Sequence, residues 1–251
     1  MSRKARKNLC SNYAHIMVQG INREYIFNNE KNMKKYKDII VDNLRDSEII
    51  ILSYCIMNNH THFMMFYDEI DILSKFMHKV NSAYSMYYNR INDRVGYVFR
   101  DRFKVQEIID RDQLYNCLRY IHNNPVKAKI CSTMDEYKYS SYNEFLGKKQ
   151  IINDKSIELL FGDNSDYKGT FEIIHNNCKD ESFIDLVEMS FDEFITEYTK
   201  KRGLGINDIR NNKRELEMFI KETRNKTDAS LVEIAHTLDM SKSQVGFYSN
   251  K

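Results

Sequence analysis

The sequence of 251 residues predicts an α+β fold: a ferredoxin-like antiparallel sheet with helices on one face, followed by an all-α C-terminal region that ends in a helix-turn-helix. Three observations support this prediction. Short segments with alternating apolar residues are typical of strands, segments with helical spacing lie between them, and the last forty or so residues contain two helix-capping signatures. The order strand-helix-strand-strand-helix-strand is that of the split ferredoxin-like arrangement.

Local patterns identify each element in turn. Residues 13–19 (YAHIMVQ) alternate and include β-branched and aromatic side chains, whereas residues 72–91 place apolar side chains at helical intervals. The predicted strands are 13–19, 49–57, 61–67 and 102–109, and the predicted helices are 32–44, 72–91 and 112–123. Pro125 is the only proline in the chain, and we expect it to end the last helix because proline disrupts a helix interior.

Changes in composition predict three domains: residues 1–150 with the sheet, an acidic helical connector at 151–203, and a helix-turn-helix domain at 204–251. The glycines in Gly203-Leu-Gly205 mark the second boundary. The sequences SLVE (230–233) and SKSQ (241–244) are capping boxes, each of which opens a short helix. An ordinary helical hairpin is the alternative interpretation of this region.

Composition excludes several classes of protein. No apolar segment approaches the roughly 20 residues that span a bilayer, and the N-terminus lacks a signal-peptide core. The five cysteines are odd in number, form no C-x-x-C pair and are spread over the whole chain, which argues against a disulfide framework or a zinc ribbon. We therefore expect a soluble, cytoplasmic protein with reduced thiols and no membrane association.

Two histidines are candidate metal ligands. His60 and His62 are separated by one residue on a predicted strand, so both imidazoles project from the same face. Two neutral imidazoles in this position can chelate a divalent cation. The H-x-H pattern also arises by chance, so it is weak evidence on its own.

A tyrosine on the following helix is a candidate nucleophile. Tyr120 lies off the apolar stripe of the helix and is four residues before Asn124, so the two side chains project from neighbouring positions. A metal held by His60, His62 and Asn124 could orient a phosphodiester for attack by the phenol, which would form a covalent phosphotyrosine and a free hydroxyl. A tyrosine that merely packs at a helix end is the alternative.

These residues resemble a known family. Residues 57–63 (MNNHTHF) are similar to the histidine-hydrophobic-histidine motif of the single-strand tyrosine transposases (the HUH family), and residues 120–128 (YIHNNPVKA) are similar to their tyrosine helix. The blocks YAHIMVQGINR (13–23), GYVFRDRFK (96–104) and YSSY (139–142) match as well. The resemblance covers roughly residues 1–146 and favours the branch associated with repetitive extragenic palindromes.

The resemblance implies a set of roles. Tyr120 is implied to be the nucleophile, His60 and His62 the metal ligands, and Asn124 the third ligand, although that position is usually glutamine in the insertion-sequence relatives. Thr61 stands where the motif usually has a hydrophobic residue. The implied cofactor is Mg²⁺ or Mn²⁺, the implied partner is hairpin-forming single-stranded DNA, and the implied assembly is a monomer or a homodimer.

Basic and aromatic side chains are candidate DNA contacts. Arg100, Arg102 and Lys104 are expected to bind phosphates, with Tyr97 and Phe99 as surfaces on which bases stack; Arg23 follows the first strand and is a further phosphate contact. In the C-terminal helix-turn-helix, which is expected to bind duplex DNA, the candidate contacts are Lys242 and Gln244.

Two other functions remain open from the sequence. A ferredoxin-like domain can hold single-stranded nucleic acid without cutting it. A helix-turn-helix transcription regulator with an inactive transposase domain is the other alternative.

Overall fold

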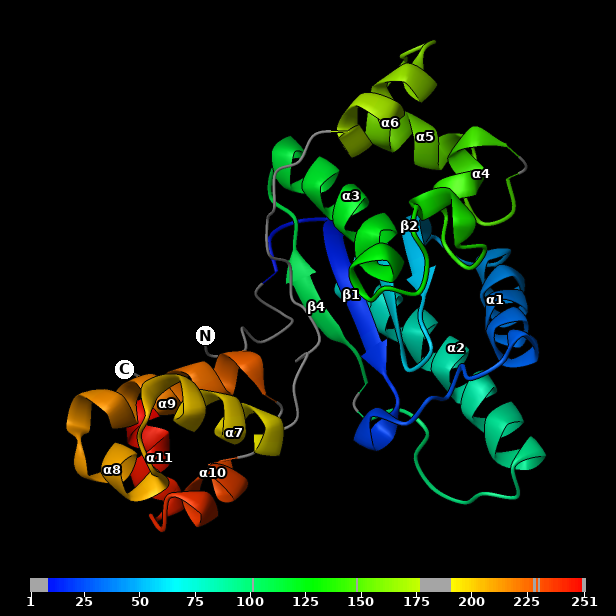
Figure 1. Ribbon diagram of the computed structural model, residues 1–251. Helices are drawn as coiled ribbons and strands as arrows, with labels where there is room; N and C mark the ends of the chain where they lie inside the picture. Colours follow the sequence, from blue (N-terminus) through cyan, green and yellow to red (C-terminus); the bar gives the residue numbers. More distant parts are fainter. Residues whose placement is uncertain are drawn as a thin grey trace. The chain divides into compact units, whose positions relative to one another are not determined.

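The computed structural model describes residues 9–100, 102–147, 149–176, 191–227, 229 and 231–249 (Figure 1). Two compact units divide the chain near residue 183. We name their described parts the sheet unit (residues 9–176) and the helical unit (residues 191–249). No helix of the described chain is long and apolar enough to cross a bilayer.

The sheet unit follows the predicted order of elements. Its strands are β1 (Tyr13–Gln19), β2 (Ile50–Ile56), β3 (His60–Phe66) and β4 (Lys104–Glu107). Its helices are α1 (Glu30–Leu44), α2 (Ile70–Ile91), α3 (Arg111–Lys127), α4 (Tyr142–Leu146), α5 (Asp154–Phe161) and α6 (Tyr167–Asn176), with short 3-10 turns η2 (Ile21–Arg23) and η3 (Met134–Glu136). The strands form one antiparallel sheet in the order β2-β3-β1-β4, which confirms the predicted mixed α+β fold.

Helices cover both faces of this sheet, so the prediction that they lie on one face is wrong (Figure 1). On one face, Tyr36 of α1 packs against Phe63 of β3, with ring centroids 6.5 Å apart, and against Tyr84 of α2. On the other face, Tyr120 of α3 packs against His62. His62 and Phe63 are neighbours in one strand and therefore point to opposite sides. The two helices of the split arrangement share a face as expected, and α3 is an addition to it.

Helix α3 carries the predicted nucleophile and is longer than predicted. Asp110 caps its first turn by accepting a hydrogen bond from the backbone N–H of Gln113 (2.8 Å). Pro125 does not end the helix, which continues to Lys127. Because Pro125 lies in the last turn, its missing N–H removes only one helical hydrogen bond, and Ala128 N–H still bonds the carbonyl of Asn124.

A buried relay of hydrogen bonds fixes α3 against β2, α4 and α6. His175 Nδ1 donates to the carbonyl of Phe171 (2.7 Å), so its Nε2 accepts from His122 Nδ1 (2.8 Å). His122 Nε2 then accepts from the Ser141 hydroxyl (2.6 Å), whose oxygen accepts the backbone N–H of Tyr54 (2.9 Å). Because His175 donates to a backbone carbonyl at one end of the relay, the direction of the bond between the two histidines follows, and the Ser141 hydroxyl also lies 3.3 Å from the carbonyl of Tyr54.

A buried carboxylate fixes the neighbouring segment. One oxygen of Glu144 accepts hydrogen bonds from the Tyr54 hydroxyl (2.5 Å) and the Lys37 ammonium (2.9 Å). The other accepts from three consecutive backbone N–H groups, those of residues 150–152. Burial alone would raise the pKa of Glu144, but these donors outweigh it and lower the pKa. The ionised carboxylate thus joins α1, β2 and α4.

The helical unit has its own apolar core. It consists of α7 (Phe191–Arg202), α8 (Ile206–Asn211), α9 (Lys213–Lys226), α10 (Leu231–Thr237) and α11 (Lys242–Ser249). Phe194 and Tyr198 of α7 pack with Phe219 of α9, so α7 belongs to this core. Side chains of α5 and α6 belong instead to the core of the sheet unit. The described chain therefore divides inside the predicted connector 151–203 and not at its ends.

Helices α10 and α11 follow one another after a short turn, in which Asp239 adopts a left-handed conformation (φ 49°). The predicted capping box at the start of α11 is present: Ser241 Oγ accepts from Gln244 N–H, and Gln244 Oε1 accepts from Ser241 N–H. Ser230, which opens the other predicted box, lies outside the described residues.

The buried histidines of the relay predict that the sheet unit becomes less stable against unfolding at acidic pH. Burial lowers the pKa of His175 to about 4, whereas an unfolded histidine titrates near 6.5. Below about pH 6.5 the unfolded chain therefore binds a proton that the folded chain excludes, so the free energy of unfolding falls as the pH falls toward 4. Between about pH 7 and about pH 5, His175 alone should account for a loss of about 2 kcal/mol.

Urea unfolding with a chelator present, followed by circular dichroism at both pH values, measures this loss. His175→Phe keeps an aromatic ring and should reduce the pH dependence by about that amount. His78→Gln removes an exposed histidine of the same unit and should leave the pH dependence unchanged. A His175→Phe variant with the full pH dependence would show that the relay is not its source.

Candidate active site

The two histidines of β3 lie side by side on the face of the sheet that α3 covers. His62 is fully buried and His60 is partly exposed. Their ring centroids are 4.9 Å apart and the ring planes are nearly perpendicular, at 87°. The Oδ1 atom of Asn59 is 2.6 Å from Nδ1 of His60. Because an amide oxygen only accepts, that nitrogen carries the proton, and Nε2 of His60 keeps a lone pair for a ligand.

Tyr120 reaches the same place from α3. The centroid of its ring is 5.6 Å from that of His62, and the two planes are at 89°. Tyr120 is only 4% exposed, and the ammonium group of Lys127 lies 5.3 Å from the centre of its ring. The structure thus brings the predicted nucleophile next to a predicted metal ligand, although the two are far apart in the sequence.

Asn124, the predicted third ligand, is buried one helical turn after Tyr120. Its Nδ2 donates to the backbone carbonyl of Tyr120 (2.9 Å), which is a local contact within α3. This bond occupies the amide nitrogen and leaves the carbonyl oxygen as the atom suited to a hard cation. Metal binding by Asn124 stays a prediction.

Two polar residues of β1 on this face were given no role from the sequence. Met17 pairs directly with His62, so His15, two residues earlier, projects on the same side. Nε2 of His15 is 2.8 Å from Nδ1 of His62. Gln19 pairs with His60, and its buried Oε1 has no hydrogen-bond partner in the described chain. Strand alternation was the signal available for both, but it needed the pairing of β1 with β3.

Burial keeps these imidazoles neutral. It lowers the pKa of His15 and of His60 to about 3. It also lowers the pKa of His62 well below its usual value, and the nearby His60 and His15 add to this effect. The neutral imidazole is the form that binds a metal.

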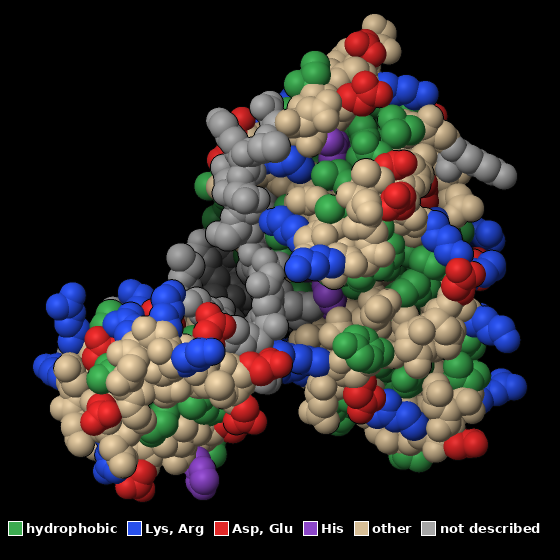
Figure 2. All heavy atoms as spheres, in the orientation of Figure 1, with side chains coloured by type: hydrophobic (Ala, Val, Ile, Leu, Met, Phe, Trp, Pro, Cys, Tyr) green, Lys and Arg blue, Asp and Glu red, His purple; other side chains and the backbone are tan. Residues whose placement is uncertain are grey.

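The basic residues predicted to bind DNA are placed differently from one another. Lys104 of β4 pairs with Met17, which pairs with His62, so the Lys104 side chain shares the histidine face. Arg100 and Arg102 are exposed just before β4, and Arg100 N–H donates to the carbonyl of Gln19. On the face drawn in Figure 2, Lys and Arg side chains flank a histidine at the surface of the sheet unit.

Arg23 follows β1 near the histidine motif. Its carbonyl accepts a hydrogen bond from the Asn59 amide (3.4 Å), and its backbone is left-handed, with φ 59°. Of the aromatic residues expected to stack on bases, Tyr97 is 83% exposed, whereas Phe99 is only 8% exposed and belongs to the core. Stacking on Phe99 is therefore inconsistent with the structure.

The two C-terminal residues predicted to bind DNA differ in whether their side-chain polar atoms are already used in a hydrogen bond. Lys242 is exposed at the first turn of α11. The Gln244 side chain is exposed too, but its carbonyl oxygen already accepts the Ser241 N–H in the capping box. Base recognition by Gln244 would have to use its amide nitrogen alone or break the cap.

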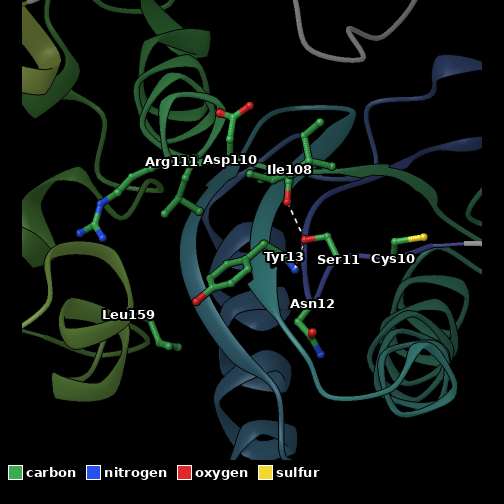
Figure 3. A pocket seen from close by; sticks show the side chains of 10 residues that line it. Cys10, Ser11, Asn12, Tyr13, Ile108, Asp110, Arg111 and Leu159 are labelled. Atoms are coloured by element: carbon green, nitrogen blue, oxygen red, sulfur yellow. Dashed lines mark hydrogen bonds between the residues drawn. The ribbon is translucent and has the colours of Figure 1, made fainter.

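A pocket of about 570 Å³ lies elsewhere in the sheet unit, where β1 and α3 begin (Figure 3). Its lining includes Ser11, Tyr13 and Arg111, and the Ser11 hydroxyl donates to the carbonyl of Ile108. Neither the histidines nor Tyr120 line it, so it is not the site of the predicted chemistry.

Comparison with known proteins identifies the segment that carries these residues. Residues 8–124 match the family of IS200-like transposases. The chain is similar to the solved structure of a REP-associated tyrosine transposase bound to a REP hairpin, with 17% identity, a TM-score of 0.49, and coverage of 59% of this chain and 87% of that one. No curated protein sequence matches. The segment that matches this family, residues 8–124, includes His60, His62, Tyr120 and Asn124.

Proposed function

We propose that the sheet unit cleaves and rejoins single-stranded, hairpin-forming DNA through a covalent 5′-phosphotyrosine at Tyr120. The observation that carries this proposal is the contact between the Tyr120 ring and His62, with centroids 5.6 Å apart. In the reaction, the phenol oxygen forms a bond to phosphorus and loses its proton, while the bond from phosphorus to the 3′ oxygen breaks and that oxygen gains a proton to become a 3′ hydroxyl. Attack by a 3′ hydroxyl on the phosphotyrosine reverses these changes and rejoins a strand.

The residues present fit a divalent cation. Nε2 of His62 is buried and has no hydrogen-bond partner among the described residues, and the Asn59 contact leaves Nε2 of His60 able to accept. His60, His62 and the Asn124 oxygen would hold Mg²⁺ or Mn²⁺, of which Mn²⁺ accepts imidazole more readily. When bound, such a cation polarises the phosphodiester. No group of three or more His, Cys, Asp or Glu ligands occurs in the described chain, so a site here depends on an amide oxygen or on substrate oxygens.

Positive side chains on the same face support a phosphodiester substrate. Lys104 shares the histidine face, and Lys127 lies over the Tyr120 ring. Arg23, Arg100 and Arg102 would bind the flanking backbone, since Lys and Arg neutralise phosphates without reading sequence. The exposed ring of Tyr97 offers a surface on which an unpaired base can stack.

Tyr120→Phe tests the catalytic role. The variant keeps the ring that packs on His62 but lacks the attacking oxygen, so it should form no covalent adduct with a labelled DNA hairpin in Mg²⁺ or Mn²⁺. DNA binding should persist within a few-fold. A denaturing gel detects the adduct, and fluorescence anisotropy measures binding.

Tyr115→Phe is the matched control, because Tyr115 lies on the same helix and its hydroxyl is close to the carbonyl of Leu160 instead. This variant should form the adduct. An adduct in Tyr120→Phe would contradict the proposal. Binding without an adduct in the natural protein would favour the non-catalytic binding module.

A second function, duplex DNA binding by the helical unit, is supported by the α10-turn-α11 arrangement with its capped second helix. The outward side of α11 presents Lys242, Ser243 and Phe247, the last of which is 59% exposed. A helix that projects polar and apolar side chains in this way fits a major groove. The function of the helical unit would be to hold the catalytic unit near its target.

Removal of residues 184–251 should weaken binding to duplex DNA and leave adduct formation on a hairpin oligonucleotide intact, because the sheet unit has a separate core. Lys242→Gln in the full chain should weaken duplex binding by a few-fold and reduce its salt dependence. Lys213→Gln, which removes an exposed lysine of α9, is the control and should have little effect. Unchanged duplex binding after the deletion would exclude this role.

A further inference from the structure

His15 and His62 form a close, buried hydrogen bond between two strands. Nε2 of His15 is 2.8 Å from Nδ1 of His62. The two rings are nearly parallel, at 8°, with centroids 5.0 Å apart, so the bonded nitrogens lie between the ring centres. The side chains are 1% and 0% exposed, which keeps water from replacing either partner.

The direction of this bond decides what His62 offers to a ligand. If Nδ1 of His62 donates, Nε2 of His62 keeps its lone pair; if Nδ1 accepts, Nε2 carries the proton. Nε2 of His62 is buried and has no hydrogen-bond partner in the part of the chain described here. A cation bound to Nε2 of His62 needs the lone pair on that atom. Cation binding therefore requires the first direction, in which Nδ1 of His62 carries the proton and His15 accepts it.

His60 has the same arrangement. Its Nδ1 is occupied by the Asn59 oxygen at 2.6 Å, so an acceptor lies behind each of the two imidazoles on the side away from Nε2. Acceptors in this position fix the tautomer and the ring orientation of metal-binding histidines and make them more basic.

We propose that His15 is a positioning residue that accepts the Nδ1–H of His62 and thereby holds Nε2 of His62 ready to bind a divalent cation. This inference rests on the proposed function, in which His60 and His62 hold the cation. The His15 ring also packs edge-on against the ring of Tyr120, with centroids 5.7 Å apart, and the proposed role of His15 is exerted through His62.

Mn²⁺ binding to the full-length protein without DNA, measured from the electron paramagnetic resonance signal of free Mn²⁺, tests this role. His15→Phe keeps an aromatic ring but has no acceptor, and should weaken Mn²⁺ binding by about 10- to 100-fold. His15→Gln supplies an amide oxygen as acceptor and should restore most of the affinity. Met17→Leu changes the packing directly opposite His62 without removing an acceptor, so it should bind Mn²⁺ as the natural protein does.

Nitrogen-15 NMR of the histidine rings in the natural, metal-free protein gives a readout that does not depend on any variant folding. The proton of His62 should be on Nδ1, and its assignment to Nε2 would overturn the proposal. Undiminished Mn²⁺ affinity in folded His15→Phe would also overturn it, while leaving the metal site of the proposed function in place. Absence of Mn²⁺ binding in the natural protein would overturn both that metal site and the role of His15.

Discussion

The alternation of side chains along β3 separates the two tasks of the sheet unit. His62 faces α3, and its neighbour Phe63 faces the aromatic core formed with α1 and α2. A strand places adjacent side chains on opposite sides, so one seven-residue segment serves a dry core and a polar site at once. The polar site requires a cover on the second face, and α3 provides both the cover and the tyrosine. A register shift of one residue would turn the imidazoles into the core.

The position of α3 depends on contacts made on its side away from the sheet as well. His122 of α3 is tied to Ser141 and His175, and Ser141 in turn bonds the backbone of β2. Segments well beyond the family match at residues 8–124 thus help to place Tyr120. The fold surrounding the site is larger than the segment that carries the chemical groups.

Much of this architecture is visible in the sequence, because it depends on local periodicity. The bounds of β1 were predicted to the residue. The prediction that Tyr120 lies off the apolar stripe of α3 is wrong, because Tyr120 is buried in the same core cluster as the residues of that stripe. The placement of α3 on the second face could not be predicted in this way, since it depends on packing between distant segments. The end of α3 was misplaced because a proline in the last turn costs one hydrogen bond rather than a whole helix.

The role of His15 and the limit on Gln244 were hidden for a related reason. A lone histidine in an apolar strand is unremarkable until the pairing of β1 with β3 brings it to His62. Gln244 looked equally suited to capping a helix and to reading a base, and the structure shows that its oxygen serves the cap. In both cases the residue type indicated a possible role, but the residue that it contacts could not be predicted from the sequence.

Glu144 illustrates how narrowly a buried acceptor can constrain chemistry. All five of its neighbours, the Tyr54 hydroxyl, the Lys37 ammonium and three main-chain amides, bring hydrogens toward it. Glutamine has the same shape, but its amide NH₂ group would place its hydrogens against those of the surrounding donors. The neutral amide would also leave the positive charge of Lys37 uncompensated. At this position an exchange that keeps the shape of the side chain still replaces an acceptor by a donor, so the segment that Glu144 anchors depends on the charge of this residue and not only on its volume.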